Sequence, residues 1–295
     1  MEIVYTICSF SSSPIWYSIQ AMKSEYSFSR AAFVIALFLA SPCLGESPAG
    51  SSSEGGAGYR DLKADIIASY SGKSPVSWGE TVEGVKTRIR NGEKTIALTM
   101  DACGSPKGMQ IDKALIDYLE KEKIPATLFI NGRWIEPNRK DFDRLAVNPL
   151  FEIGNHGLAH KPASVNGRSV YGIQGTKNIA ELVDEIELNA KKIEALTGVR
   201  PKYYRSGTAY YDEIAVRIAG ELEQQTAGFS LLGDAGATYS RQQVKNALLS
   251  AKSGDIAILH FNHPESGTAG GVMDAIPELK KRGFRFVRLS DVELE

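Results

Sequence analysis

The sequence contains little cysteine or histidine, and neither sign of charge dominates. Its 295 residues include three cysteines, four histidines, 34 Lys+Arg and 35 Asp+Glu, for a formal net charge of −1. An apolar fraction of 43% and a charged fraction of 23% are typical of soluble globular proteins and exclude a disordered, collagen-like or coiled-coil chain. Binding to nucleic acid depends on neutralising phosphates with clustered basic side chains, so this balanced charge argues against nucleic-acid partners.

The sequence also lacks a hydrophobic run long enough to cross a membrane. The longest, AAFVIALFLA at residues 31–40, falls short of the roughly 20 apolar residues that a spanning helix needs. Lys23 and Arg30 precede it and the small residues SPCLGES follow, which is the pattern of a secretory signal. We therefore expect residues 1–45 to be a signal peptide and the mature protein to be exported, periplasmic or extracellular, without a transmembrane anchor.

The charged segment before the apolar run begins at Met22, so we expect translation to start there and residues 1–21 to be an upstream extension. Cleavage of the signal would leave Cys103 as the one remaining cysteine, which excludes an intrachain disulfide. Residues 46–58, ESPAGSSSEGGAG, are rich in Gly and Ser and predict a flexible linker. The folded domain is expected over residues 59–295.

From Lys94 onward, β-rich runs alternate with segments of helical periodicity, which indicates βα units and a largely parallel sheet. Seven βα units in about 200 residues favour a barrel or near-barrel, with an open doubly wound sheet as the alternative. Residues 59–93 are expected to pack across one end. Strands are predicted around residues 95, 126, 151, 202, 227, 255 and 284, and helices around residues 111–122, 136–146, 179–197, 212–224, 242–251 and 271–282.

Polar side chains follow five of the predicted strands directly, and the four histidines occur as two pairs, in NHGLAH and HFNHP. In a βα barrel, the loops after the carboxyl ends of the strands build the active site. We therefore expect these side chains to converge at one end of the barrel. They are Asp101, His156, His160, Arg205, Asp234, His260 and His263.

Each residue also has a structural interpretation when it is taken alone. His156 and His160 are compatible with simple hydrogen bonds to nearby backbone, and Cys103 with a small buried apolar side chain. Arg205 and Asp234 are compatible with a structural ion pair. Joint placement favours a functional site, because imidazoles four residues apart direct two nitrogens to one point and imidazole is the commonest metal ligand.

The succession TMDACG, NHGLAH, YYRSG, GDAG and AILHFNHP, over residues 94–291, resembles the polysaccharide deacetylase family, carbohydrate esterases that share the NodB homology domain. The resemblance implies a deformed (β/α)7 barrel. It also implies a divalent metal, Zn²⁺ or else Co²⁺, and the removal of acetyl groups from an N-acetylated sugar polymer such as peptidoglycan or an exopolysaccharide.

The resemblance assigns roles to the first two motifs. Asp101 matches the first aspartate of the family's T-F-D-D stretch, which acts as general base on a water that the metal activates. Ala102 stands where the second aspartate would bind the metal. His156 and His160 match the two metal-binding histidines.

The later motifs supply the remaining catalytic groups by the same resemblance. Arg205 matches the arginine that orients the basic aspartate, although Ser206 and Gly207 replace the usual prolines. His260 matches the histidine that acts as general acid, and Asp234 matches the acid that tunes it. The resemblance also implies that Ile258 and its neighbours form the apolar pocket for the acetyl methyl group.

Ala102 leaves three interpretations of the metal site. In the one we prefer from the sequence, Asp101 itself ligates the metal, because an Asp-His-His set is usual in the family. Alternatively Cys103 supplies the third ligand, since alternate residues of a strand share a face. In the third, the protein binds no metal and is a carbohydrate-binding pseudoenzyme.

A different class of function is a hydrolase of another amide-type C–N bond with Cys103 as the nucleophile. We expect this to be disfavoured, because the nearby Asp101 carboxylate should raise the pKa of the thiol. His263 and Glu265 are further candidates for ligands, substrate contacts or a gate over the cleft.

Overall fold

The computed structural model describes residues 54–91 and 93–295. The predicted signal peptide, the start expected at Met22 and residues 46–53 of the predicted linker lie outside the described residues. Within the described ranges, none of the helices combines the length and the apolarity that crossing a membrane requires.

The prediction of a flexible linker was wrong for residues 54–58, because helix α1 begins at Glu54 and runs to Tyr70. Tyr59, Leu62 and Ile66 recur at helical spacing and pack, with Tyr70, into an apolar cluster that includes residues of helix α5 (Ile179–Thr197). The buried stripe stabilises a helix that extends backward into the Gly/Ser-rich segment.

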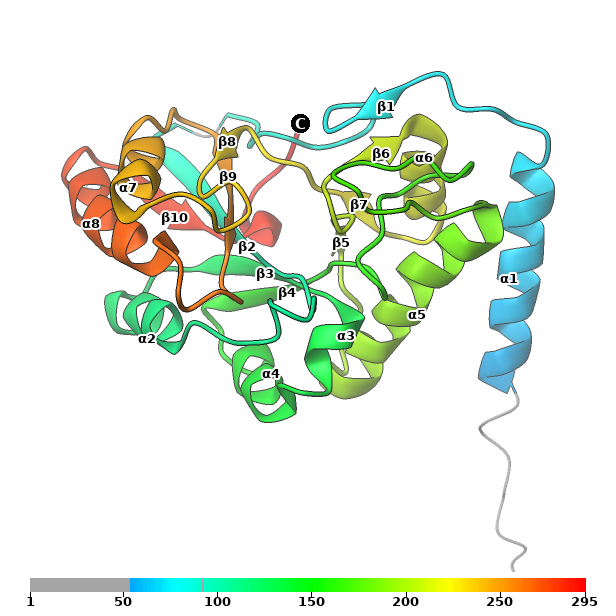
Figure 1. The fold of residues 1–295 in the computed structure, drawn as a ribbon, viewed down its shortest axis with the longest axis horizontal. Coiled ribbons are helices and arrows are strands. Elements are labelled where there is room, and N and C mark those ends of the chain that lie inside the picture. Colours follow the sequence, from blue (N-terminus) through cyan, green and yellow to red (C-terminus); the bar gives the residue numbers. More distant parts are fainter. Residues whose placement is uncertain (1–53, 92) are drawn as a thin grey trace, which may run out of the picture. The chain divides into compact units, whose positions relative to one another are not determined.

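A curled sheet of parallel strands forms the centre of the fold, with helices around its outside (Figure 1). The strands follow the order β7-β5-β4-β3-β2-β9-β8, and β10 pairs with the first residues of β2. These seven strands, with β10 beside β2 as an eighth, form a half-barrel and confirm the predicted NodB-type deformed (β/α)7 barrel. The strands are β2 Thr95–Ala102, β3 Ala126–Ile130, β4 Phe151–Asn155, β5 Tyr203–Tyr204, β7 Gln225–Thr226, β8 Leu231–Leu232, β9 Asp255–His260 and β10 Arg285–Val287.

The strand predicted around residue 227 is two short strands, β7 and β8, with residues 227–230 between them. The carbonyl oxygens of Ala227 and Gly228 accept hydrogen bonds from the Arg205 guanidinium, at 3.1 and 2.8 Å. Because these oxygens bind a buried side chain, the strand is interrupted there.

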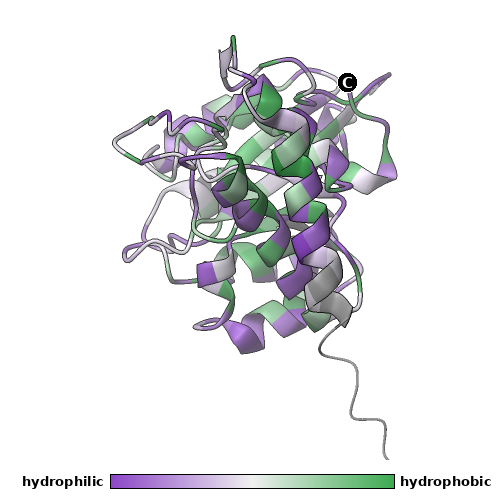
Figure 2. Cartoon of the chain, turned by 90° about the vertical axis from the view of Figure 1, so that its right-hand side faces the viewer, coloured by the Kyte–Doolittle hydropathy of each residue, from purple (hydrophilic) through white to green (hydrophobic). Residues whose placement is uncertain are grey.

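The other helices occupy the predicted positions, except that the helix predicted at 136–146 begins only at Arg139, as α4. A short helix that was not predicted, α3, precedes it at Gly132–Ile135. Pro137 lies between α3 and α4, where its missing amide hydrogen disfavours one continuous helix. Figure 2 shows hydrophobic and hydrophilic residues alternating along the helices, as expected for helices with one face on a sheet. The remaining helices are α2 Lys113–Glu122, α3 Gly132–Ile135, α4 Arg139–Ala146, α6 Glu213–Glu221, α7 Arg241–Leu249, α8 Thr268–Lys281 and the 3₁₀ turn Leu289–Asp291.

Residues 71–91 pair with other segments at several places instead of forming one cap across the end of the sheet. Strand β1 (Trp78–Gly79) pairs antiparallel with β6 (Tyr211–Asp212) in a small second sheet. Further on, Lys86 forms a β-bridge with Ala227, and Arg88 forms one with Asp255.

Successive side chains at the end of strand β2 point alternately into the apolar core and toward the cavity. Met100 and Ala102 are fully buried in the main apolar cluster, between the sheet and the outer helices. Asp101 projects to the opposite face, and Cys103 follows on the same side as Asp101. An acidic side chain at position 102 would enter the apolar core, so this backbone excludes residue 102 from the site.

Candidate active site

The predicted polar residues converge around a cavity of about 780 Å³ at the carboxyl ends of the strands. Its wall includes Asp101, Cys103, His160 and His260, and also Ile258, at the position expected for an acetyl-methyl contact. The volume is within the range of small-molecule sites.

Asp101 and Arg205 form a buried ion pair at the floor of the cavity. Arg205 is fully buried and Asp101 is 2% exposed, and Arg205 Nη1 donates to Asp101 Oδ1 at 2.8 Å. The Arg205 guanidinium also lies 4.3 Å from the centroid of the Phe129 ring. Burial raises the pKa of Asp101, but the charges of Arg205, His156 and His260 outweigh it and leave the pKa below its usual value. Asp101 is therefore an ionised, fixed carboxylate.

His260 and Asp234 form the second charge pair. Asp234 is fully buried, and its Oδ1 lies 2.9 Å from His260 Nδ1, while its Oδ2 accepts from the His260 amide at 2.7 Å and from Thr268 Oγ1 at 3.0 Å. A carboxylate only accepts, so Nδ1 carries a proton and Nε2 is left for the cavity. Burial lowers the pKa of His260, but Asp234 and the neighbouring Cys103 raise it well above its usual value.

His156 is oriented by the backbone of the third motif. Its Nδ1 lies 3.0 Å from the carbonyl oxygen of Arg205, so Nδ1 donates and Nε2 presents its lone pair to the site. That Nε2 lies 3.7 Å from Asp101 Oδ2 and 3.8 Å from Cys103 Sγ. The ring is 1% exposed, and its fixed orientation suits a metal ligand.

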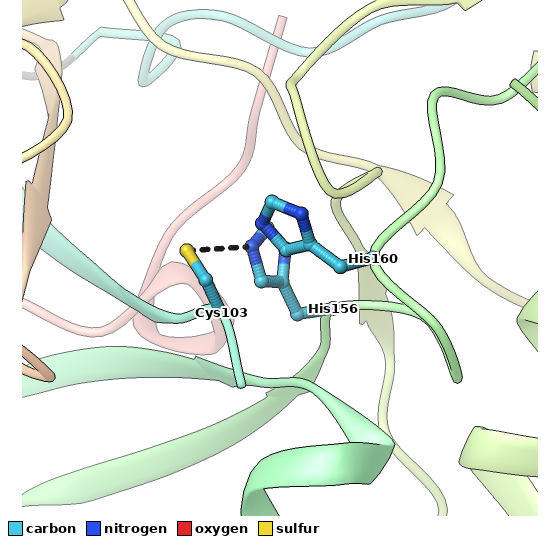
Figure 3. Close-up of side chains that lie close together, drawn as sticks. All are labelled: Cys103, His156 and His160. Atoms are coloured by element: carbon cyan, nitrogen blue, oxygen red, sulfur yellow. Dashed lines mark hydrogen bonds between the residues drawn. The ribbon is translucent and has the colours of Figure 1, made fainter. Parts of the chain in front are cut away.

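Cys103, His156 and His160 bring one ligand atom each to within 4.8 Å of one another (Figure 3). In Figure 3 the Cys103 sulfur, from the segment after β2, faces the imidazoles of the loop after β4. In a tetrahedral zinc site, with a Zn–S bond of about 2.3 Å and a Zn–N bond of about 2.05 Å, the sulfur and the nitrogen lie about 3.6 Å apart. The 3.8 Å between Cys103 Sγ and His156 Nε2 is close to this distance.

An unpartnered nitrogen gives a second indication that the site takes a ligand. Among residues 54–91 and 93–295, the Nε2 of His160 is buried without a hydrogen-bond partner. A buried polar atom without a partner is costly unless a ligand satisfies it. The donor set of one sulfur and two imidazoles is one that zinc accepts. These residues therefore fit a divalent metal.

The expected effect of Asp101 on the thiol was wrong. Burial does raise the pKa of Cys103, but the imidazoles of His160, His156 and His260 lower it well below its usual value. The tertiary fold surrounds the sulfur with three imidazoles, and this outweighs one carboxylate two residues away.

The loop that carries both histidines is held by residues that the sequence reasoning missed. The Glu185 carboxylate on α5 accepts from the amides of Ala159 (3.0 and 2.9 Å) and Lys161 (3.1 Å), on either side of His160. His160 itself has a positive φ of 61°. A Cβ at Gly207 would lie 2.3 Å from the carbonyl carbon of His160, so only glycine fits there. The sequence did carry one sign of this close contact, because Gly207 stands in the third motif where prolines are usual.

His263 and Glu265 pair with each other at the rim. His263 Nδ1 lies 2.9 Å from Glu265 Oε1, and His263 lines the cavity while Glu265 is exposed. Within the described part of the chain, neither residue joins the set of three metal-donor atoms.

Comparison with known proteins places this arrangement in a family. Residues 88–227 match the family model described as polysaccharide deacetylase. This part of the chain is a polysaccharide deacetylase domain. The match covers the Asp101, His156, His160 and Arg205 motifs.

Two relatives align with most of the chain. A peptidoglycan-N-acetylglucosamine deacetylase from Bacillus cereus is 28% identical over 212 residues, which cover 70% of this chain and 92% of that protein. A bifunctional xylanase/deacetylase from Pseudobutyrivibrio xylanivorans is 26% identical over 206 residues, which cover 68% of this chain but 30% of that longer protein.

A solved structure confirms the fold. A CE4 family pseudoenzyme from Bacillus anthracis superposes with a TM-score of 0.59 at 18% identity, covering 79% of this chain and 80% of that one. Because a pseudoenzyme shares this deacetylase fold, the activity has to be argued from the site itself.

Proposed function

We propose that the protein is a metal-dependent hydrolase that removes acetyl groups from N-acetylated sugar polymers such as peptidoglycan. The main support is that three metal-donor side chains, two of which line the cavity, lie close together beside two charge pairs, Asp101–Arg205 and His260–Asp234. The B. cereus relative, named as a peptidoglycan-N-acetylglucosamine deacetylase, agrees with this substrate class.

We infer that Cys103, and not Asp101, joins His156 and His160 as the third ligand of a zinc ion. The sulfur belongs to the compact donor set, whereas Asp101 lies outside it and one of its oxygens binds Arg205. This revises the ligand set preferred from the sequence. When bound, a divalent ion would polarise the acetamide carbonyl and lower the pKa of a water molecule.

The protein's own residues would move the protons. Asp101, held ionised and in place by Arg205, accepts the proton of the attacking water. His260, fixed by Asp234, donates a proton from Nε2 to the sugar nitrogen as the C–N bond breaks. The products are acetate and a free amine, and Ile258 contacts the acetyl methyl group.

Metal content and acetate release test this function together. Purified wild-type protein should contain about one metal ion per chain by mass spectrometry and release acetate from N-acetylglucosamine oligomers. His260→Ala should keep the metal and lose about 10²- to 10⁴-fold in rate, because it removes the general acid alone. His156→Ala should lose both. A wild-type protein that releases no acetate with any added divalent ion contradicts the proposal.

Cobalt substitution tests the thiolate ligand separately. Sulfur bound to Co²⁺ produces a charge-transfer absorption in the near ultraviolet, which oxygen and nitrogen ligands do not. The band should be present in wild type and in Asp101→Asn and absent in Cys103→Ser. Wild type that binds cobalt but lacks the band would exclude the thiolate and restore Asp101 as the third ligand.

A metal-free carbohydrate-binding protein is the second candidate. Ala102 and the structural likeness to a pseudoenzyme favour it. This candidate predicts oligosaccharide binding with neither metal nor acetate release.

A thiol hydrolase of another amide-type C–N bond is the third candidate, favoured by the low pKa of Cys103. It predicts activity without metal that a thiol-blocking reagent abolishes and bound substrate protects.

We also propose that the protein is exported, to the periplasm or beyond. The support is the apolar run at residues 31–40 with its flanking basic and small residues. Amino-terminal sequencing of the protein from the producing cells tests this. A first residue near position 46 is expected, and a retained run would contradict cleavage.

A further inference from the structure

A tight hairpin presents a tyrosine at the rim of the cavity. Val170 and Ile173 exchange backbone hydrogen bonds of 3.2 and 2.8 Å, so Tyr171 and Gly172 form a two-residue turn. Both turn residues have positive φ, 54° and 74°, as a type I′ turn requires. Glycine adopts this conformation freely, but tyrosine does so with strain. Strained residues of this kind concentrate at functional sites.

Tyr171 is exposed and belongs to a group of aromatic rings. It is 70% exposed, and its ring meets that of Tyr210 edge-to-face, with centroids 5.5 Å apart. The Tyr210 ring lies 5.8 Å from that of Trp78, and the Arg168 guanidinium lies 5.2 Å from the Trp78 ring centroid. We call Trp78, Tyr171 and Tyr210 the aromatic ledge.

The aromatic ledge is continuous with the catalytic cavity. Tyr171 and Glu80 line the same cavity as Cys103 and His260. The Tyr171 hydroxyl lies 3.5 Å from Glu80 Oε1, so an acceptor carboxylate stands beside the exposed ring. The cavity therefore extends beyond the reacting groups to an aromatic surface with a charged acceptor.

We propose that the aromatic ledge and Glu80 form a subsite for a second sugar ring of the polymer, next to the ring that is deacetylated. This rests on the proposed function. The apolar C–H face of a pyranose packs on the electron-rich face of an aromatic ring. The hydroxyls of the same sugar donate hydrogen bonds to a carboxylate. Binding at this subsite would hold the polymer so that the reacting acetamido group stays in place.

Calorimetric titration of the protein with the hexamer of N-acetylglucosamine tests the subsite. Tyr171→Asn removes the ring but suits a positive φ, and Tyr171→Phe keeps the ring. The expected result is a Kd raised about threefold to tenfold in Tyr171→Asn and within about twofold of wild type in Tyr171→Phe. Val147→Ala, which alters an exposed side chain that does not line the cavity, is the matched control and should bind like wild type.

The titration separates the subsite from the proposed function, because it measures binding whether or not acetate is released. Weakened binding in Tyr171→Asn supports the subsite even if wild type proves inactive. Equal Kd values for wild type and Tyr171→Asn overturn it even if wild type releases acetate. Wild type that does not bind the hexamer also overturns it, as does an equal loss in Val147→Ala.

Discussion

Replacing Arg205 by methionine should destabilise the protein more than most single substitutions. The guanidinium is fully buried and donates to Asp101 at 2.8 Å and to the carbonyls of Ala227 and Gly228 at 3.1 and 2.8 Å. Methionine has similar bulk but leaves the 2%-exposed Asp101 carboxylate and both carbonyls without this donor. The cost therefore comes from unpaired buried polar groups and not from a cavity.

Breaking a buried ion pair from one side costs about 3–5 kcal/mol. For a domain of this size, about 2–4 °C is lost per kcal/mol, so Arg205→Met should lower Tm by about 6–20 °C. Urea unfolding followed by circular dichroism gives the free energy, and calorimetry gives Tm.

The double variant Arg205→Met with Asp101→Asn decides whether the loss is electrostatic. Neutralising the carboxylate should recover part of the stability, with a coupling energy of about 0.5–3 kcal/mol. A loss below about 1 kcal/mol in Arg205→Met, or strictly additive effects in the double variant, would refute the view that this ion pair is buried and paired as described.

Three further predictions concern other parts of the fold. Glu213→Gln should lower the free energy of unfolding by about 2 kcal/mol at pH 7. Burial raises the pKa of Glu213, but hydrogen bonds from residues 76–77 outweigh burial and lower this pKa to about 2. Because the pKa is depressed, ionised Glu213 stabilises the folded protein at pH values above its unfolded pKa of about 4.5. In urea titrations, the difference in unfolding free energy between wild type and Glu213→Gln should therefore fade as the pH drops toward 2. Gly207→Ala should cost about 1–3 kcal/mol by calorimetry and reduce metal content, because its Cβ would displace His160, and unchanged values would contradict the steric argument. Glu185→Ala should weaken metal binding about 10- to 100-fold in chelator competition, since it frees the loop around His160; wild-type affinity would show that the loop holds itself.

Local chemistry was enough to predict much of the fold. Alternating β-rich and helical segments predicted the parallel sheet and its helices. The helix predicted over residues 179–197 is α5, and it ends at Gly198, which has a positive φ of 74°. The position of polar residues directly after strands predicted that Asp101, His156 and His260 would meet, because parallel strands deliver their carboxyl ends to one side of a sheet. These features depend on periodicity and strand direction, which neighbouring residues determine.

Contacts between distant segments decided the rest. Helix α1 extends through residues predicted as a linker because its apolar stripe packs on α5, more than a hundred residues away. The thiol of Cys103 has a lowered pKa because the fold brings in imidazoles from the loop after β4 and from the end of β9, which the neighbouring Asp101 could not indicate. The aromatic ledge likewise joins Trp78 to residues far along the chain. A pKa, a ligand set or a binding surface depends on which groups lie within a few ångströms, and only the tertiary structure determines that.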